Sequence, residues 1–263
     1  MLTISNVHKT FFPGTANERI ALAGIDLDLA EGDFCTIIGS NGAGKSTLLN
    51  TVAGRLRPDT GTVRIDGADI TRMKEHQRAT HIGRVFQDPL AGTAPNLTIE
   101  ENLSLAYLRG KRRGLGRSLS SSRREFFREQ LVTLELGLED RMGHKVGLLS
   151  GGQRQALSLL MAGFTQPKVM LLDEHTAALD PQRADLVTTL THSIVEEGGL
   201  TTLMVTHNME QALRVGNRLI MMHEGRIVWQ TEGEEKRKLT VHDLLAQFAA
   251  IKGATLSDKA FLG

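Results

Sequence analysis

The chain has 263 residues, enough for one large domain or two small ones, and 40% of them are hydrophobic, which suffices for a sizeable core. Its 31 basic and 30 acidic residues leave a net charge of +1, which argues against bulk electrostatic binding of nucleic acid. A single cysteine, Cys35, excludes an internal disulfide framework and is typical of a reducing compartment. No apolar run reaches the roughly 18 residues of a membrane helix, and residues 1–5 do not resemble a signal peptide. We therefore expect a soluble cytosolic chain that reaches a membrane only through a partner.

Short apolar runs alternate with helical patterns, which predicts an α/β fold with parallel strands. Buried strands are predicted at 33–39, 168–174 and 201–208, and a shorter strand between glycines is predicted at 61–67. Each of the three buried strands ends in polar residues. Ligands bind at this edge of open parallel sheets.

Two helices carry clear end signals. The segment 46–56 predicts a helix that directly follows the strand at 33–39 and its glycine loop, and that stops near Pro58. The segment 181–199 predicts a second helix, with Asp180 as its N-cap and Pro181 at its first position.

The C-terminal third predicts a hairpin and a final helix. Residues 218–230 form two apolar runs around a turn at Glu224–Gly225. Thr240 and Asp243 open the last helix as a capping pair. Its apolar stripe favours docking on the core over a partner surface and consists of Val241, Leu244, Leu245, Phe248 and Ile251.

Between the predicted strands the character of the chain changes, and we interpret 88–148 as a helical insert. Thr98 and Glu101 form a capping box ahead of an apolar helix. The stretch 109–128 then holds eight Arg or Lys and one Glu.

The segment "GSNGAGKST" (39–47) matches the pattern G-x-x-x-x-G-K-[ST] between a strand and a helix. Its glycines let backbone N–H groups surround a β-phosphate, and the helix N-terminus adds partial positive charge. Lys45 reaches the β- and γ-phosphates, and the Ser46 hydroxyl can bind Mg²⁺. The complete context disfavours a glycine-rich turn without a ligand. The predicted nucleotide-binding residues are Gly39, Ser40, Asn41, Gly42, Ala43, Gly44, Lys45, Ser46 and Thr47.

Two further strand ends carry candidate catalytic side chains. Asp173 follows a buried strand, as expected for a Mg²⁺ ligand, and the adjacent Glu174 is placed to act as a general base on water. Alone, this acidic pair fits the start of a solvated loop equally well, but the phosphate loop favours the catalytic reading. His207 follows the third strand and can donate a hydrogen bond to a γ-phosphate, although a lone histidine there is usually only a loop residue.

The motifs occur in a telling order: "GSNGAGKST", Gln87 in "VFQDP", "LSGGQRQ" (149–155), "VMLLDE" (169–174), "ALD" (178–180) and His207. In this order they resemble the ATP-binding cassette (ABC) ATPases over residues 1–230, and "LSGGQ" is close to diagnostic for that family. The resemblance implies a P-loop NTPase core with a mostly parallel sheet, an N-terminal antiparallel β part, and the helical insert at 88–148. Residues 231–263 would form a C-terminal helical tail.

The same resemblance assigns roles that the residues alone do not. Gln87 would lie near Mg²⁺ and the attacking water and would link the site to the helical insert, which contacts a membrane partner in this family. Asp180 would lie at a dimer interface. Phe11 would stack on adenine, with Phe12 as the neighbour if the register differs, and a core aromatic is the alternative for both.

The family's cassettes dimerise head to tail around two ATP molecules. Each phosphate loop is then completed by the partner's signature turn, which here comprises Ser150, Gly151, Gly152 and Gln153. A helix N-terminus with two glycines suits this task, because exposed N–H groups bind anions and glycine allows close approach.

One residue departs from the family pattern. His175 follows Glu174 where many relatives have proline or alanine, and Thr176 then keeps the hydroxyl found in relatives. We expect His175 to be a partly exposed bystander, with a contribution to pH dependence as the alternative. All catalytic positions are intact, so the resemblance implies an active ATPase.

A single cassette without a fused membrane domain resembles the subunits of bacterial importers. The amino-acid sequences of the motifs are similar to those of ATPases that serve a substrate-binding lipoprotein and a branched-chain-amino-acid-type permease. These transport systems are labelled as aromatic amino-acid uptake systems. We expect a homodimer, or a pair with a second ABC ATPase, at the cytoplasmic face of the inner membrane. The alternatives are a soluble ABC ATPase acting on ribosomes or nucleic acid, and the ATPase of a split exporter. The basic stretch 109–128 fits a solvated face first, lipid or permease contact second and nucleic acid last.

Overall fold

The computed structural model describes residues 1–111, 119–177 and 179–261. The strands are β1 (Leu2–Phe11), β2 (Arg19–Leu29), β3 (Phe34–Gly39), β4 (Thr60–Ile65), β5 (Ala68–Asp69), β6 (Ile82–Val85), β7 (Val169–Asp173), β8 (Thr201–Val205), β9 (Arg218–His223) and β10 (Arg226–Glu232). The α-helices are α1 (Lys45–Ala53), α2 (Glu75–Arg78), α3 (Ile99–Tyr107), α4 (Ser121–Val132), α5 (Gly151–Gly163), α6 (Pro181–Glu197), α7 (Met209–Arg214), α8 (Gly233–Lys238) and α9 (Val241–Phe261). Two short 3₁₀ helices are η1 (Glu139–Arg141) and η2 (Val146–Leu148).

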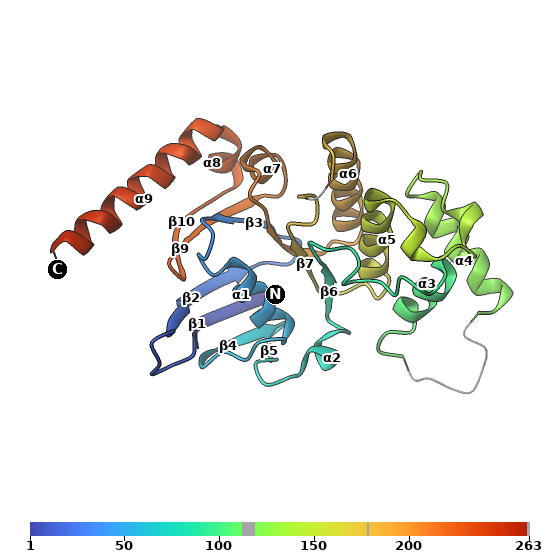
Figure 1. Cartoon of the computed structure of the whole chain (residues 1–263), viewed down its shortest axis with the longest axis horizontal. Coiled ribbons are helices and arrows are strands. Elements are labelled where there is room, and N and C mark those ends of the chain that lie inside the picture. Colours follow the sequence, from blue (N-terminus) through green and yellow to red (C-terminus); the bar gives the residue numbers. More distant parts are fainter. Residues whose placement is uncertain (112–118, 178, 262–263) are drawn as a thin grey trace.

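The strands form two sheets (Figure 1). The larger sheet has the order β10-β9-β3-β8-β7-β6, in which β9, β3, β8, β7 and β6 run parallel and β10 pairs antiparallel with β9. The smaller sheet has the order β2-β1-β4-β5 and is antiparallel throughout. The predicted α/β class, with a mostly parallel sheet and an N-terminal antiparallel part, is confirmed.

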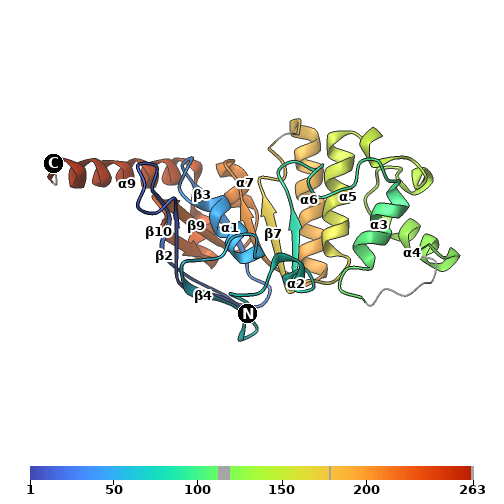
Figure 2. The same cartoon turned by 60° about the horizontal axis from the view of Figure 1, so that its bottom comes forward.

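Strand β7 shows how the core is divided between the two faces of the larger sheet. Val169 and Leu171 point into a cluster shared with α1 and the smaller sheet, whereas Met170 and Leu172 point into a cluster shared with α5 and α6. This alternation follows from the two-residue period of a strand, and both faces are apolar because both are covered. Helices α1 and α5 therefore lie on opposite sides of the sheet, as Figures 1 and 2 show.

The helical part follows β6. The expected capping box is present at the start of α3, where the Glu101 N–H donates to the Thr98 hydroxyl at 3.3 Å and the Thr98 N–H donates to the Glu101 carboxylate at 2.7 Å. Helices α3 and α4 share a buried apolar cluster with α5, so α5 belongs to the same packing unit. Of the basic stretch 109–128, residues 112–118 lie outside the described part of the chain, as does Ala178 of the "ALD" motif.

Several predicted boundaries hold, but two elements end three residues early: the strand expected at 201–208 ends at Val205, and the helix expected at 46–56 ends at Ala53. Asp180 caps α6 by accepting a hydrogen bond from the Arg183 N–H at 3.1 Å. The β9–β10 hairpin turns at Glu224–Gly225, as predicted. Helix α1, expected to run to residue 56, ends at Ala53 because Gly54 adopts the left-handed conformation that closes helices (φ +81°).

The tail docks through part of its predicted stripe. Leu244 is fully buried against α7 and β9, whereas Leu245 is exposed, so its inclusion in the stripe was wrong. A helix buries only one face, and two adjacent positions lie about 100° apart around its axis. Helix α9 then projects away from the sheets (Figures 1 and 2). In the part of the chain that the structure describes, no helix is long and apolar enough to cross a membrane.

Candidate functional site

Four neighbouring parallel strands end at one edge of the larger sheet, and each carries a predicted functional segment. The loop 39–47 begins at the last residue of β3, and Asp173 ends β7 with Glu174 directly after it. His207 follows β8, and Gln87 follows β6, each after one intervening residue. These strands are adjacent in the order β3-β8-β7-β6. The sheet topology thus gathers residues that are up to 168 positions apart in the sequence along one ligand-binding edge.

The glycine-rich loop has a backbone that only glycine accommodates at its last turn. Gly44 has φ +101°, and a Cβ at this position would lie 2.3 Å from the carbonyl oxygen of Ala21. The close approach of β2 and the left-handed backbone therefore both require glycine. This turn delivers Lys45 to the first position of α1, where Ser46 and Thr47 follow.

The Lys45 side chain is buried within the loop that precedes it. Its Nζ donates to the carbonyl oxygens of Gly39 at 2.7 Å and Ser40 at 3.0 Å. Burial lowers the pKa of Lys45, while the nearby carboxylates of Glu174 and Asp173 raise it. The ammonium group, the loop and both acids therefore lie within electrostatic reach of one another.

The acidic pair is held in two different ways. Glu174 sits at a left-handed backbone position (φ +44°), its N–H donates to the Val205 carbonyl oxygen at 2.9 Å, and its carboxylate pairs with Nε2 of His207. Asp173 lies 3.5 Å from the Arg84 guanidinium. Burial raises the pKa of Asp173, and Arg84, Lys45 and His207 oppose that rise.

The structure thus brings Lys45, Asp173, Glu174 and His207 together. The histidine is half-exposed and the Glu174 carboxylate is largely buried, so the pair faces solvent from the histidine side. Gln87 is exposed two residues beyond the end of β6. The preceding Phe86 carbonyl accepts a hydrogen bond from the buried Gln155 at 3.1 Å, which ties this loop to α5.

Phe11 ends strand β1, and its neighbourhood links it to the phosphate loop. It is partly exposed and pairs across the sheet with Arg19 of β2. The Arg19 guanidinium in turn donates to the Gly42 carbonyl oxygen at 3.0 Å. Phe12 is 66% exposed, so it is not a core aromatic. Sequence analysis missed Arg19, since no motif marks it.

The signature turn caps its own helix. The Gln153 N–H donates to the Ser150 hydroxyl at 3.3 Å, and the Ser150 N–H donates to the Gln153 side chain at 3.2 Å. Gly151 and Gly152 occupy the first turn between them. The signature turn begins α5 and the phosphate loop leads into α1, and these two helices cover opposite faces of the larger sheet. The two segments of one chain therefore do not belong to the same face.

The expected exposure of His175 was wrong. The imidazole is 3% exposed, and its Nε2 lies 3.0 Å from the Thr191 hydroxyl of α6. That hydroxyl donates to the Val187 carbonyl oxygen at 2.7 Å, so it accepts from His175. Burial lowers the pKa of His175 to about 4. The side chain at the position after Glu174 is thus a neutral core residue that anchors the acidic loop to α6.

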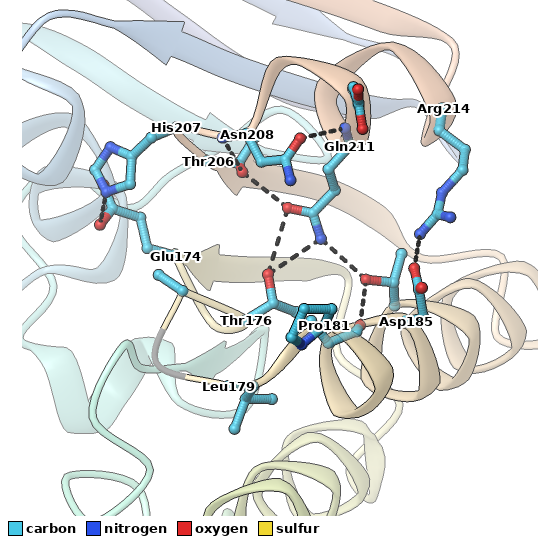
Figure 3. Close-up of a pocket in the computed structure, with 14 residues that line it drawn as sticks. Glu174, Thr176, Leu179, Pro181, Asp185, Thr206, His207, Asn208, Gln211 and Arg214 are labelled. Carbon is cyan, nitrogen blue, oxygen red and sulfur yellow. Dashed lines mark hydrogen bonds and ion pairs between the residues drawn. The ribbon is translucent and has the colours of Figure 1, made fainter.

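A pocket of about 590 Å³ lies beside the Glu174–His207 pair and is shown in Figure 3. Its wall includes Thr176 and Leu179 from the loop before α6, and Asn208 and Gln211 from the start of α7. Leu179 belongs to the "ALD" motif and Thr176 follows His175 in the acidic loop, whereas Asn208 and Gln211 lie outside the sequence motifs.

A glycine loop that closes on a buried lysine, followed along the same sheet edge by two acids and a histidine, defines a P-loop NTPase. Residues 22–177 match the family described as "ABC transporter". The chain therefore belongs to the ABC transporter family and is an ATP-binding and ATP-hydrolysing subunit of that family.

Individual relatives agree with this assignment. The chain is 44% identical over 248 residues to a protein named "Tyrosine transport ATP-binding protein" from Clostridioides difficile, a match that covers 94% of this chain and 98% of the relative. It is 37% identical over 209 residues to a "Thiamine import ATP-binding protein ThiQ" from Salmonella choleraesuis, covering 80% and 84%. A solved dimeric structure, described as a post-hydrolysis state of the ATP-binding cassette MJ0796 bound to ADP and Pi, superimposes with a TM-score of 0.75 at 33% identity, covering 88% and 98%.

Proposed function

We propose that this chain drives a bacterial importer for a small solute, with an aromatic amino acid as the favoured substrate class. The observation that carries the ATPase part is the shared sheet edge with Lys45, Asp173, Glu174 and His207. Import and the substrate class are supported by the 44% identity to a protein named for tyrosine transport, along 94% of this chain. The partners would be a permease of the branched-chain-amino-acid type and an extracytoplasmic substrate-binding lipoprotein. The subunit would then work at the cytoplasmic face of the inner membrane, with no nucleic acid involved.

The residues of the sheet edge fit a nucleotide and its magnesium ion. The backbone N–H groups of 39–47 would surround the phosphates, and Lys45 would contact the β- and γ-phosphate oxygens. The Ser46 hydroxyl, the Asp173 carboxylate and the Gln87 amide are oxygen donors of the kind Mg²⁺ prefers. When bound, the ion would neutralise charge on the β- and γ-phosphates. Phe11 would provide the flat surface for adenine, close to the loop through Arg19.

Glu174 and His207 would carry the hydrolytic step. The Glu174 carboxylate would accept a proton from the attacking water, and the His207 ring would donate a hydrogen bond to the γ-phosphate. The pairing of the two side chains fixes both orientations. Lys45 would stabilise the charge that develops on the transferred group.

The signature turn would complete the site of a second copy. Ser150, Gly151, Gly152 and Gln153 would present a helix N-terminus to the nucleotide bound by the partner, and Asp180 would lie at the interface between the two cassettes. Closure of the dimer would move the permease through the helical insert, which packs against α5, the helix that is hydrogen-bonded to the Gln87 loop.

The Glu174→Gln variant tests the catalytic assignment. The amide keeps the size of the carboxylate but cannot accept the proton, so we expect turnover to fall at least about 100-fold while ATP binding persists. The variant should also accumulate as an ATP-bound dimer, measured by size-exclusion chromatography with light scattering. Hydrolysis at the wild-type rate would contradict the general-base role.

Mixed dimers test the shared site. In a Lys45→Ala homodimer and in a Ser150→Arg homodimer, both composite sites are damaged. A mixed dimer has one site that combines the intact Lys45 of one chain with the intact Ser150 of the other. We expect the mixture to regain ATPase activity that neither parent shows. Activity that never rises on mixing, at concentrations where light scattering shows mixed dimers, would refute the composite site.

The transport proposal has its own test. A tagged Glu174→Gln chain, purified with ATP from detergent-solubilised membranes of its source organism, should retain a multispanning permease and a lipoprotein. Co-purification with ribosomes in place of membrane proteins would contradict import and favour the soluble alternative.

A further inference from the structure

Gln211 lies between the loop that carries Glu174 and the loop that carries His207 (Figure 3). It is in the first turn of α7, four residues after His207, and its side chain is buried. Three threonine hydroxyls from three different segments converge on its amide group. A buried amide with this many partners links elements that are otherwise distant in sequence.

Each bond has a defined direction. The Gln211 Oε1 accepts from the Thr206 hydroxyl at 2.8 Å, and its Nε2 donates to Thr188 at 3.0 Å and Thr176 at 3.2 Å. The Thr188 hydroxyl hydrogen is already used on the Ala184 carbonyl oxygen at 2.7 Å, so its oxygen requires a donor from the amide. Position 211 must therefore present an acceptor on one side and a donor on the other.

These contacts reach the catalytic pair directly on the His207 side and through one intervening residue on the Glu174 side. Thr206 directly precedes His207, and its hydroxyl also accepts from the Asn208 N–H at 3.1 Å. Thr176 follows Glu174 by two positions. On the far side, Thr188 anchors the amide to α6. The network thus spans both catalytic loops and one rigid helix.

We propose that Gln211 is a positioning residue for hydrolysis, which sets the separation of Glu174 and His207 by holding both loops against α6. This rests on the roles proposed above for that pair. The second link between α6 and α7, the Arg214–Asp185 ion pair at 3.0 Å, is more than half exposed on both sides and contributes little. The His175–Thr191 bond ties only the acidic loop to α6, whereas the buried amide joins both catalytic loops to that helix.

The test compares two replacements of the amide. Gln211→Met keeps the length of the side chain but offers no polar group, so the Thr206 hydroxyl loses its acceptor and both loops lose their common anchor. We expect kcat to fall about tenfold or more, because a displacement of about 1 Å costs that much, while KM and the affinity for a fluorescent ATP analogue stay within about twofold. Gln211→Glu keeps acceptors for the Thr206 and Thr176 hydroxyls but has no donor for Thr188, so kcat should fall as well, by less than in Gln211→Met.

Two further measurements separate positioning from loss of stability. The matched control is Thr202→Val, on strand β8, which leads to the His207 loop. It removes a buried hydroxyl that donates to the Leu200 carbonyl oxygen at 3.2 Å, away from the Glu174–His207 pair. It should leave kcat unchanged. The His207 ring resonances in NMR spectra, assigned by comparison with His207→Gln, should shift in Gln211→Met and not in Thr202→Val.

The outcomes are distinct. An unchanged kcat in Gln211→Met, an unchanged kcat in Gln211→Glu, or equal losses in the Thr202→Val control would each overturn the proposal. If Gln211→Met does not fold, Thr188→Val removes only the anchor on α6 and should still lower kcat without changing KM; an unchanged kcat there counts against the idea. If instead the Glu174→Gln variant is fully active, the error lies in the assignment of the catalytic pair.

Discussion

Lowering the pH should weaken the fold through His175. The buried imidazole donates from Nε2 to Thr191, whose own hydrogen is committed to Val187. Protonation would add a second N–H donor and a charge inside the core, at the residue next to Glu174. Burial accordingly lowers the pKa of His175 from 6.5 to about 4.

The sign and size of the effect follow from linkage. The unfolded chain binds this proton as the pH falls through 6.5, whereas the folded chain resists it until about 4, so stability is lost across that window. The difference between the two pKa values corresponds to about 3 kcal/mol in total. Between about pH 7 and pH 5, about 2 kcal/mol of it should disappear.

Urea unfolding of the wild type and of His175→Phe at these two pH values measures the effect. Phenylalanine fills the site and cannot be protonated, and Thr191 keeps its bond to Val187. We expect the wild type to lose about 2 kcal/mol more than His175→Phe on acidification. His192→Gln, on the exposed side of the same helix, should follow the wild type. Equal losses in the wild type and in His175→Phe would refute the buried-histidine reasoning.

Three further predictions use other parts of the chain. Gly44→Ala would place a Cβ 2.3 Å from a backbone carbonyl oxygen of β2 at a left-handed backbone position. It should lower the free energy of unfolding by at least about 2 kcal/mol and abolish binding of a fluorescent ATP analogue. Gly67→Ala, with positive φ but open space around the new Cβ, should retain binding. Arg84→Gln removes the cation that lies 3.5 Å from Asp173 and opposes the rise of that carboxyl's pKa, so the Mg²⁺ concentration at half-maximal ATPase rate should rise, and a fall would contradict this role of Arg84. Lys236→Met removes a buried ammonium that donates to the Gly216 carbonyl oxygen at 2.8 Å, and the melting temperature should drop. Because burial lowers the pKa of Lys236 to about 8, the wild type should gain stability relative to this variant as the pH rises from about 8 to 10.

The sequence could predict the strand ends of the site because their signals are local. Gly44 and Lys45 belong to one short loop with a fixed spacing, and a buried apolar run ahead of Asp173 is enough to place that residue at a sheet edge. Helix caps such as Asp180 are equally local, since cap and partner are three residues apart. Signals of this kind survive in a single sequence.

The contacts that tune the site could not be predicted in this way. Arg19 meets Gly42 across 23 positions, and Gln211 meets Thr176 across 35. The exposure of His175 was misjudged because it depends on Thr191 of α6, which packs over the acidic loop only in the folded chain. Long-range side-chain geometry has no periodic or spacing signal from which to infer it.

The charges around Asp173 show why such contacts matter for function. Burial alone would favour the protonated carboxyl, which could not bind a metal ion, and three basic side chains from three different segments oppose this: Arg84, Lys45 and His207. Lys45 and His207 face the nucleotide in the proposed mechanism. The negative charge of a bound triphosphate would therefore offset their electrostatic effect on the Asp173 carboxylate. Arg84, stacked on Phe86 at 4.6 Å beside the Gln87 loop, would then be the remaining protein cation that keeps Asp173 ionised. The same guanidinium lies against the loop that is tied to α5, so movement of the helical part would change the charge environment of Asp173, the proposed magnesium ligand.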